Sequence, residues 1–282
     1  MKSFFLVLLS SLLIAVAGAA VETDIEYGRA AGESLKLDAY VPEGAGPFPA
    51  VILVHGGGWT TGDKNGGARK GFMYPMHAPL EKAGFAWFSI NYRLAPAHRY
   101  PACIEDVETA IRWVKANPTK YRVDPRRIAL SGESAGGHLV ALAAVRADAS
   151  TRLAAIVPFY GVFDMVAMVT PDEPLRRNFV ALFNRQTFDE STRSVLREAS
   201  PLTHVKAGLP PFLLVHGTAD ATVPLAQSER MLARLREVGV PCELQTVPNG
   251  AHGMLGWEAL APDFDDKIVA WLVKTLGTVE TP

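Results

Sequence analysis

Cysteine is scarce in this sequence, which has only two, Cys103 and Cys242, in 282 residues. Two cysteines are too few for the disulfide framework that is typical of small secreted domains. The two residues also fall in different predicted elements, so a bond between them needs a proximity that the sequence does not show. We therefore expect two buried free thiols.

An excess of charge of one sign is also absent, because the formal net charge is −1 and no run of lysine or arginine forms a basic patch. The sequence gives no broad electrostatic reason to bind nucleic acid or anionic lipid. After the N-terminus, no stretch approaches the roughly 20 apolar residues of a membrane span. Neither a metal-ligand set nor a nucleotide fingerprint appears, so we expect no metal and no cofactor.

The N-terminus differs from the rest of the chain. Lys2 is followed by residues 4–17, which are apolar apart from two serines, and then by small residues that suit cleavage. A charged start, a short apolar core and small residues predict a secretory signal peptide over residues 1–20. We expect export to the periplasm or the outside of the cell. The alternative is an uncleaved membrane anchor, which the shortness of the apolar run disfavours.

Strand-like and helix-like segments alternate after residue 48. The run AVILVH at 50–55 ends in glycines and is typical of a strand covered on both faces. Further strands are predicted at 85–92, 127–130, 153–159, 212–216 and 242–247, and helices at 102–116, 135–145, 223–238 and 264–276. This alternation predicts an α/β fold with a mostly parallel central sheet and helices on both faces.

Two segments depart from this alternation of strands and helices. Residues 24–30 and 35–41 are predicted as strands joined by a Gly-Glu-Ser turn, and we expect them to form an antiparallel edge. Residues 165–205 carry three prolines and several phenylalanines without a clear period, which predicts a small cap-like insertion over the sheet. Because the chain has no internal repeat and no low-complexity linker, we expect a single domain over residues 21–282.

The segment Gly-Glu-Ser-Ala-Gly at 132–136 places Ser134 between a predicted strand and a predicted helix. A sharp turn there holds a serine exposed in a strained conformation, and Gly132 and Gly136 leave room for strand and helix to approach. The helix N-terminus also favours developing negative charge. The alternative is an ordinary N-cap serine. Glu133 adjoins the serine, and we expect it to point into a side-chain network.

The segment His-Gly-Gly-Gly-Trp at 55–59 follows the AVILVH strand directly. Acyl transfer passes through a tetrahedral intermediate, and preorganised N–H donors stabilise the negative charge on its oxygen. Glycines let the backbone turn its amides toward a ligand. We therefore expect the N–H groups of Gly57, Gly58 and Ala135 to converge as an oxyanion hole. The alternative is a flexible connection between strand and loop.

A serine hydroxyl needs a base, and the base needs an acid that orients it. His252 follows a predicted strand in the loop before the last helix, and Asp220 lies just beyond another strand. Loops at the carboxyl ends of parallel strands are where such sheets place ligands. Asp164 and Asp172 are rival acids, and His138 is expected to line the pocket wall. We expect structural or unrelated roles for the remaining histidines, His55, His77, His98, His204 and His216.

The order of the HGGGW, GESAG, GTAD and GAHG segments resembles that of serine esterases of the α/β-hydrolase superfamily, over nearly the whole chain after residue 20. The stretch NYRLAP at 91–96 is similar to the corresponding part of the hormone-sensitive-lipase group. Members of that group usually carry a helical cap before HGGG, whereas here only two predicted strands precede it. This layout is more similar to bacterial esterases of the feruloyl and acetyl-xylan type. The resemblance implies the α/β-hydrolase fold.

The residues and the resemblance together predict a secreted serine carboxylic-ester hydrolase that works through an acyl-serine intermediate. Catalytic Ser134, His252 and Asp220 would act on a small-molecule or carbohydrate-linked ester, acetyl and feruloyl esters included. We expect Trp59, Phe179 and Phe183 to shape the acyl pocket, with ordinary packing as the alternative. Two other functions stay open, a serine peptidase of the same fold and a non-catalytic binding module. The oligomeric state does not follow from the sequence.

Overall fold

The computed structural model describes residues 20–65, 74–170 and 173–277. An eight-stranded sheet runs through this part of the chain in the order β1-β2-β4-β3-β5-β6-β7-β8. Its strands are β1 (Ala20–Ala30), β2 (Glu33–Val41), β3 (Phe48–Val54), β4 (Ala86–Ile90), β5 (Val123–Glu133), β6 (Ala155–Phe159), β7 (Phe212–Gly217) and β8 (Cys242–Val247). The pairs β1–β2 and β2–β4 are antiparallel, and every later pair along the sheet is parallel. The predicted sheet and its antiparallel edge are confirmed.

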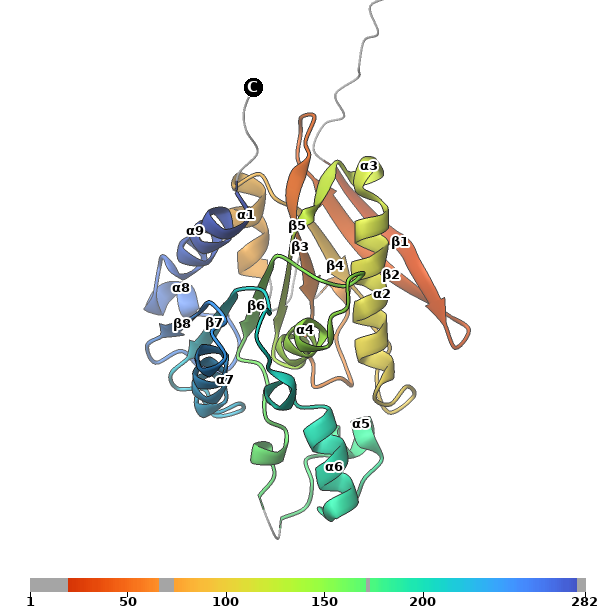
Figure 1. Ribbon diagram of the computed structural model, residues 1–282, viewed down its shortest axis with the longest axis vertical. Coiled ribbons are helices and arrows are strands. Elements are labelled where there is room, and N and C mark those ends of the chain that lie inside the picture. The colour runs from red at the N-terminus through yellow and green to blue at the C-terminus, as the bar shows by residue number, and fades with distance from the viewer. Residues whose placement is uncertain (1–19, 66–73, 171–172, 278–282) are drawn as a thin grey trace, which may run out of the picture.

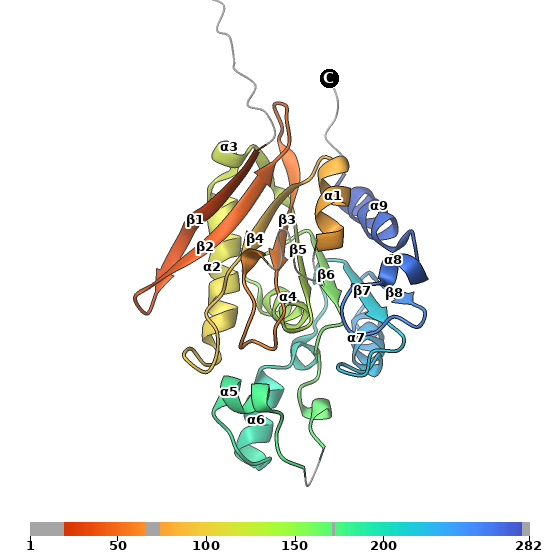
Figure 2. The same ribbon diagram turned by 180° about the vertical axis from the view of Figure 1, so that it is seen from behind.

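Helices cover both faces of the sheet. Figure 1 shows α2, α4 and α7 on the near face, and Figure 2 shows α1 and α9 on the opposite face. The described helices are α1 (Tyr74–Lys82), α2 (Ala102–Ala116), α3 (Pro118–Tyr121), α4 (Ala135–Arg146), η2 (Val166–Met168), α5 (Arg177–Phe183), α6 (Glu190–Glu198), η3 (Pro201–His204), α7 (Ala226–Glu237), α8 (Trp257–Leu260) and α9 (Phe264–Leu276). The predicted bounds of α2, β8 and α9 coincide with those observed.

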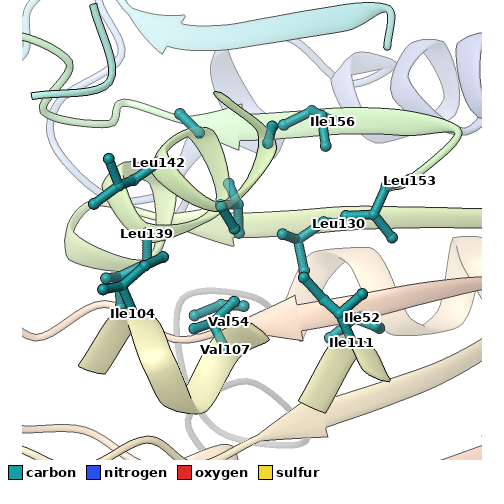
Figure 3. Close-up of a cluster of buried hydrophobic side chains, with 14 of the residues drawn as sticks. Ile52, Val54, Ile104, Val107, Ile111, Leu130, Leu139, Leu142, Leu153 and Ile156 are labelled. Carbon is teal, nitrogen blue, oxygen red and sulfur yellow. The ribbon is translucent and has the colours of Figure 1, made fainter. Parts of the chain in front are cut away.

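Two hydrophobic cores lie on opposite faces of the sheet, because successive side chains of a strand point to opposite sides. In β3, Ile52 and Val54 join the core beneath α2 and α4, whereas Val51 and Leu53 join the core beneath α1 and α9. All of β3 is buried, which explains its continuous apolar sequence. Figure 3 shows part of the first core, where Ile52 and Leu130 of the sheet face the side chains of α2.

The turn between β1 and β2 differs from the prediction. It consists of Ala31 and Gly32, both with positive φ, whereas Glu33 and Ser34 already pair with β1. The ladder therefore extends closer to the turn than a Gly-Glu-Ser connection would allow.

The cysteines also differ from the prediction in one respect. Both are free thiols, as expected. Cys103 is buried, but Cys242 begins β8, which is the edge strand of the sheet that the described residues form, and is only partly covered.

Residues 165–205 lie between β6 and β7 and contain η2, α5, α6 and η3 among their described parts. Figures 1 and 2 both show α5 and α6 set apart from the sheet and its covering helices. Nearly all of the predicted signal peptide, residues 1–19, lies outside the described residues. Within the described ranges, no helix has both the length and the apolar character needed to cross a bilayer.

Candidate active site

Ser134 occupies a tight turn between β5 and α4. Its φ of 53° and ψ of −113° lie outside the regions that non-glycine residues normally adopt. The Ser134 N–H donates to the carbonyl oxygen of Phe159 at 3.0 Å, which ties the turn to β6. A Cβ atom on Gly136 would lie 2.1 Å from the carbonyl oxygen of Val54, so helix and strand approach closely because this residue is glycine. The close approach expected of this motif is confirmed.

Three residues that are distant in the sequence meet at this turn. Nε2 of His252 lies 2.9 Å from Oγ of Ser134, and Nδ1 of His252 lies 2.7 Å from Oδ2 of Asp220. This arrangement fits a neutral imidazole whose Nδ1–H donates to Asp220 and whose Nε2 accepts from the serine hydroxyl. The rival acid Asp164 lies elsewhere, since it accepts from the Ala167 N–H and pairs with Arg230. The other rival, Asp172, lies outside the described residues.

The Asp220 carboxylate is fully buried and surrounded by donors. Its Oδ1 accepts the N–H groups of Thr222 and Val223 at 2.8 and 2.9 Å, and Nε2 of His216 lies 3.4 Å from its Oδ2. Burial alone would raise the pKa of Asp220, but hydrogen bonds from His216, His252 and the Val223 N–H outweigh it and hold that pKa well below its usual range. The carboxylate is therefore ionised at neutral pH.

An aromatic residue that the sequence reasoning missed supports the imidazole. The ring of Tyr160 packs edge to face against the rings of His252 and Trp257. The distances between ring centroids are 4.7 Å to His252 and 5.5 Å to Trp257. Tyr160 directly follows β6 and has a positive φ of 36°. Its place at the carboxyl end of a central strand was the only signal in the sequence. Trp257 in turn donates its Nε1–H to the carbonyl oxygen of Ala251, beside the histidine.

The residues expected to bind an oxyanion line the same cavity as Ser134. Gly57 and Gly58 have φ values of 95° and 60°, which glycine adopts without strain. The Gly57 carbonyl oxygen accepts the N–H groups of Thr60 and Thr61, which closes the loop into a tight turn. Ala135 is the first residue of α4, where the helix leaves N–H groups without an intrahelical partner.

The cavity beside Ser134 has a volume of about 250 Å³. Trp59 and Phe179 line it, as expected, but Phe183 does not. The ring of Phe183 packs on Tyr100 and against the far side of Phe179, because α5 turns it away from the cavity. The cavity residues that the sequence reasoning missed are Val162, Met168, Arg176, Asn178, Thr222, Val223 and Gly253.

Arg176 and Asn178 bracket the start of α5 and bring polar groups to the cavity. Arg176 is exposed and donates from Nη1 to the carbonyl oxygen of Thr222 at 3.1 Å. A Cβ atom on Gly58 would lie 3.3 Å from Nδ2 of Asn178, so the amide stands over the glycine loop. Their position next to Phe179, in the segment predicted as a cap, was the signal available in the sequence.

His138 lies behind the cavity wall. It is fully buried, accepts the Nε1–H of Trp59 at Nδ1 and donates from Nε2 to the carbonyl oxygen of Ala199. Burial lowers its pKa to about 4, so the ring is neutral at physiological pH. It links Trp59 to the inserted segment and does not line the cavity, contrary to expectation. Among the described residues, no three His, Cys, Asp or Glu side chains gather as a metal site would require.

The sequence profile of the BD-FAE family matches residues 37–235 of this chain. This range includes the HGGGW and GESAG segments and Asp220.

The chain belongs to the BD-FAE family.

This BD-FAE chain is also similar to curated proteins of Mycobacterium tuberculosis. It is 36% identical over 231 residues to the probable carboxylic ester hydrolase LipM, covering 76% of this chain and 52% of LipM. It is 38% identical over 223 residues to the esterase LipC, covering 73% of this chain and 53% of LipC. The chain thus spans about half the length of these relatives.

Two similar solved structures cover nearly the whole chain. A truncated carbohydrate esterase from gut microbiota has a TM-score of 0.76 and 26% sequence identity, covering 93% of this chain and 98% of its own. An esterase of Thermogutta terrifontis has a TM-score of 0.74 and 26% identity, covering 93% and 94%. The α/β-hydrolase fold that the motifs implied is confirmed by this likeness.

Proposed function

We propose that this BD-FAE chain is a serine carboxylesterase. The observation that carries the proposal is the continuous contact from Ser134 through His252 to the buried, ionised Asp220. This arrangement gives the hydroxyl a base and gives the base an orienting acid. The curated relatives are named as carboxylic ester hydrolases and esterases, which supports ester bonds as the target.

The reaction begins when Oγ of Ser134 attacks the ester carbonyl carbon and its proton passes to Nε2 of His252. The carbonyl oxygen becomes an oxyanion, which the N–H groups of Gly57, Gly58 and Ala135 stabilise. The bond between carbonyl carbon and alkoxy oxygen then breaks, and the leaving alcohol takes the proton from Nε2. Water then attacks the acyl carbon of the acyl-serine and gives a proton to Nε2 of His252. The bond to Oγ of Ser134 breaks, Oγ takes that proton back, and the acid is released.

The mechanism is tested with nitrophenyl acetate and with paraoxon. The wild-type protein should hydrolyse the ester and take up one diethylphosphoryl group, detected as a mass increase on the peptide that contains Ser134. Ser134→Ala should lose both. Ser131→Ala is a matched control, because this buried serine of β5, three residues before Ser134, donates to the carbonyl oxygen of Val157 and does not line the cavity. Hydrolysis that survives in Ser134→Ala would refute the mechanism.

We also propose that the substrate is a carbohydrate-linked ester of a small acid, such as an acetyl or feruloyl ester. Val162, Met168 and Phe179 give the cavity an apolar lining that suits an acyl group. Arg176 and Asn178 place hydrogen-bond donors beside it, where sugar hydroxyls need partners. The likeness to a carbohydrate esterase supports this substrate class.

The substrate proposal is tested by kcat/KM on acetylated xylan, methyl ferulate and nitrophenyl esters of rising chain length. A higher kcat/KM for acetylated xylan than for nitrophenyl acetate supports the carbohydrate-linked substrate, whereas hydrolysis of methyl ferulate, which has no sugar, supports the feruloyl acid alone. A preference that depends only on acyl length, with no gain from the sugar, would overturn it.

We further propose that residues 1–20 direct export and are removed. The charged start, the apolar core and the small residues near Ala20 support this proposal. Expression in a bacterial host followed by fractionation and N-terminal sequencing tests it. A processed N-terminus near residue 20 in the exported fraction supports export, and an intact chain retained with the cytoplasm or membrane contradicts it.

A further inference from the structure

Gly56 lies where the ladder between β3 and β5 ends. The last paired residues of that ladder are Val54 and Gly132, so the next N–H group on this side, that of Gly56, has no strand partner. Gly56 is nevertheless buried, where an unpaired N–H is costly. The side chain of Glu133 supplies the partner, because its Oε1 accepts the Gly56 N–H at 2.6 Å.

The contact between Glu133 and Gly56 is tight. A Cβ atom on Gly56 would lie 2.2 Å from Oε1 of Glu133, so the carboxyl group occupies the space of the absent side chain. On its other side, Gly56 is held through its carbonyl oxygen, which accepts the Tyr92 hydroxyl at 3.1 Å. Both backbone polar groups of Gly56 are therefore fixed immediately before Gly57 and Gly58.

Glu133 also directly precedes Ser134 in the chain, is only 5% exposed and lines the cavity. We infer that Glu133 is a positioning residue, whose carboxyl group fixes the Gly57 and Gly58 amides relative to the oxygen of Ser134. This inference rests on the proposed esterase function. Glu133 thereby sets the distance between Ser134, which follows β5, and the N–H groups of Gly57 and Gly58, which follow β3.

The charge on Glu133 adds a pH dependence to this role. Burial raises the pKa of Glu133 to about 7, against the opposing effects of the Gly56 N–H and of His252. Around it, burial keeps the hydroxyls of Tyr92 and Tyr160 neutral by raising their pKa values, and lowers the pKa of His55 to about 4. His252 is therefore the group whose charge responds to Glu133 during the reaction. An ionised Glu133 strengthens the bond from Gly56 and favours the imidazolium that forms on His252.

Two variants separate the hydrogen bond from the charge. Glu133→Gln keeps an oxygen that accepts the Gly56 N–H but cannot ionise, whereas Glu133→Ala removes both. Glu81→Ala is a matched control, because it removes a carboxylate that accepts the Trp87 indole N–H in the opposite core. All rates with a nitrophenyl ester are divided by the number of sites that paraoxon titrates, so that loss of folded protein does not count as loss of activity.

We expect Glu133→Ala to lower kcat per titrated site by at least about tenfold, since small displacements of positioned groups cost up to about a hundredfold. Glu133→Gln should match the wild type near pH 6. The ratio of wild-type to Glu133→Gln kcat should then rise with a midpoint near pH 7, as the carboxyl group of Glu133 ionises. The rise should reach about fivefold by pH 8, the gain from making one hydrogen bond charge-assisted. Glu81→Ala should show neither effect.

If Glu133 had only a structural role, Glu133→Ala would lower the number of sites that paraoxon titrates without changing kcat per site. The inference would be overturned if kcat per site of Glu133→Ala equalled that of the wild type. It would also be overturned if the ratio of wild-type to Glu133→Gln kcat stayed flat from pH 6 to 8. If Glu133→Ala does not fold, the pH-dependent ratio decides the question. A wild-type protein that hydrolyses no ester would instead overturn the proposed function.

Discussion

Replacing Asp220 by asparagine isolates the charge of the carboxylate that orients His252. Asparagine has nearly the same shape, and its Oδ1 can still accept the N–H groups of Thr222 and Val223 that now bond to Asp220. What changes is the atom that faces Nδ1 of His252 at 2.7 Å, where an amide nitrogen or a neutral oxygen replaces a charged oxygen. The variant therefore loses the interaction with the imidazolium that forms during catalysis.

The size of the effect follows from the geometry. With a contact of 2.7 Å between Nδ1 and Oδ2, the two charge centres lie roughly 4 Å apart. At an effective dielectric constant of about 20, their attraction is about 4 kcal/mol. Since each 1.36 kcal/mol is worth about tenfold in rate, kcat should fall by about a thousandfold. KM should change little, because the imidazolium exists in the transition state and not in the bound ground state.

The assay is the steady-state hydrolysis of nitrophenyl acetate at pH 8, with thermal unfolding measured on the same samples. Asp164→Asn is the control, because Asp164 is one of the two rival acids of the sequence and pairs with Arg230 at the surface. We expect its kcat to stay within about twofold of the wild type, as for most surface substitutions. A loss below about tenfold in a folded Asp220→Asn protein, or an equal loss in Asp164→Asn, would refute the assigned role.

Three further predictions follow from the packing. Gly136→Ala, which places a Cβ 2.1 Å from the Val54 carbonyl oxygen, should lower the free energy of unfolding by at least about 2 kcal/mol in urea titrations. Phe179→Ala should enlarge the cavity and raise the ratio of kcat/KM for nitrophenyl hexanoate over acetate, whereas Phe183→Ala, behind it, should leave this ratio unchanged. His138 is buried in its neutral form, with a pKa of about 4. Below about pH 6.5 the unfolded chain therefore binds more protons than the folded chain, and the free energy of unfolding falls as the pH falls. Between pH 7 and pH 5 the wild type should lose about 2 kcal/mol more than His138→Gln, by urea titration at each pH.

Much of the architecture was predictable because it depends on local patterns. The continuous apolar run of β3 and the helical spacing in α2 reflect burial that every residue of these elements shares. The bounds of α2, β8 and α9 were correct because proline, glycine or asparagine stands next to them. The turn between β1 and β2 was misplaced by the same reasoning, because Gly32, Glu33 and Ser34 all suit turns and only the pairing with β1 decides among them.

The site was predictable to the extent that motifs carry it. Ser134, Asp220 and His252 were each named from a segment at the end of a strand, and the structure brings them into contact. The aromatic residues were less predictable, because the period of the segment around α5 is unclear. Phe179 and Phe183 are spaced as one turn of α5, yet Phe179 lines the cavity and Phe183 packs behind it. The direction in which each ring points depends on how α5 packs, with Phe179 against Trp59 and Phe183 against Tyr100.

By itself, the sequence determined the class of fold, the strand-to-helix turn at Ser134 and the glycine loop after β3, since each depends on residues within a few positions of one another. Only the tertiary structure decided which acid reaches His252, that Tyr160 supports it, and that the Glu133 carboxyl meets the Gly56 amide. These contacts span 32, 92 and 77 residues along the chain (252 − 220, 252 − 160 and 133 − 56). They depend on the order of strands in the sheet, because that order brings the carboxyl ends of β3, β5, β6, β7 and β8 to one edge.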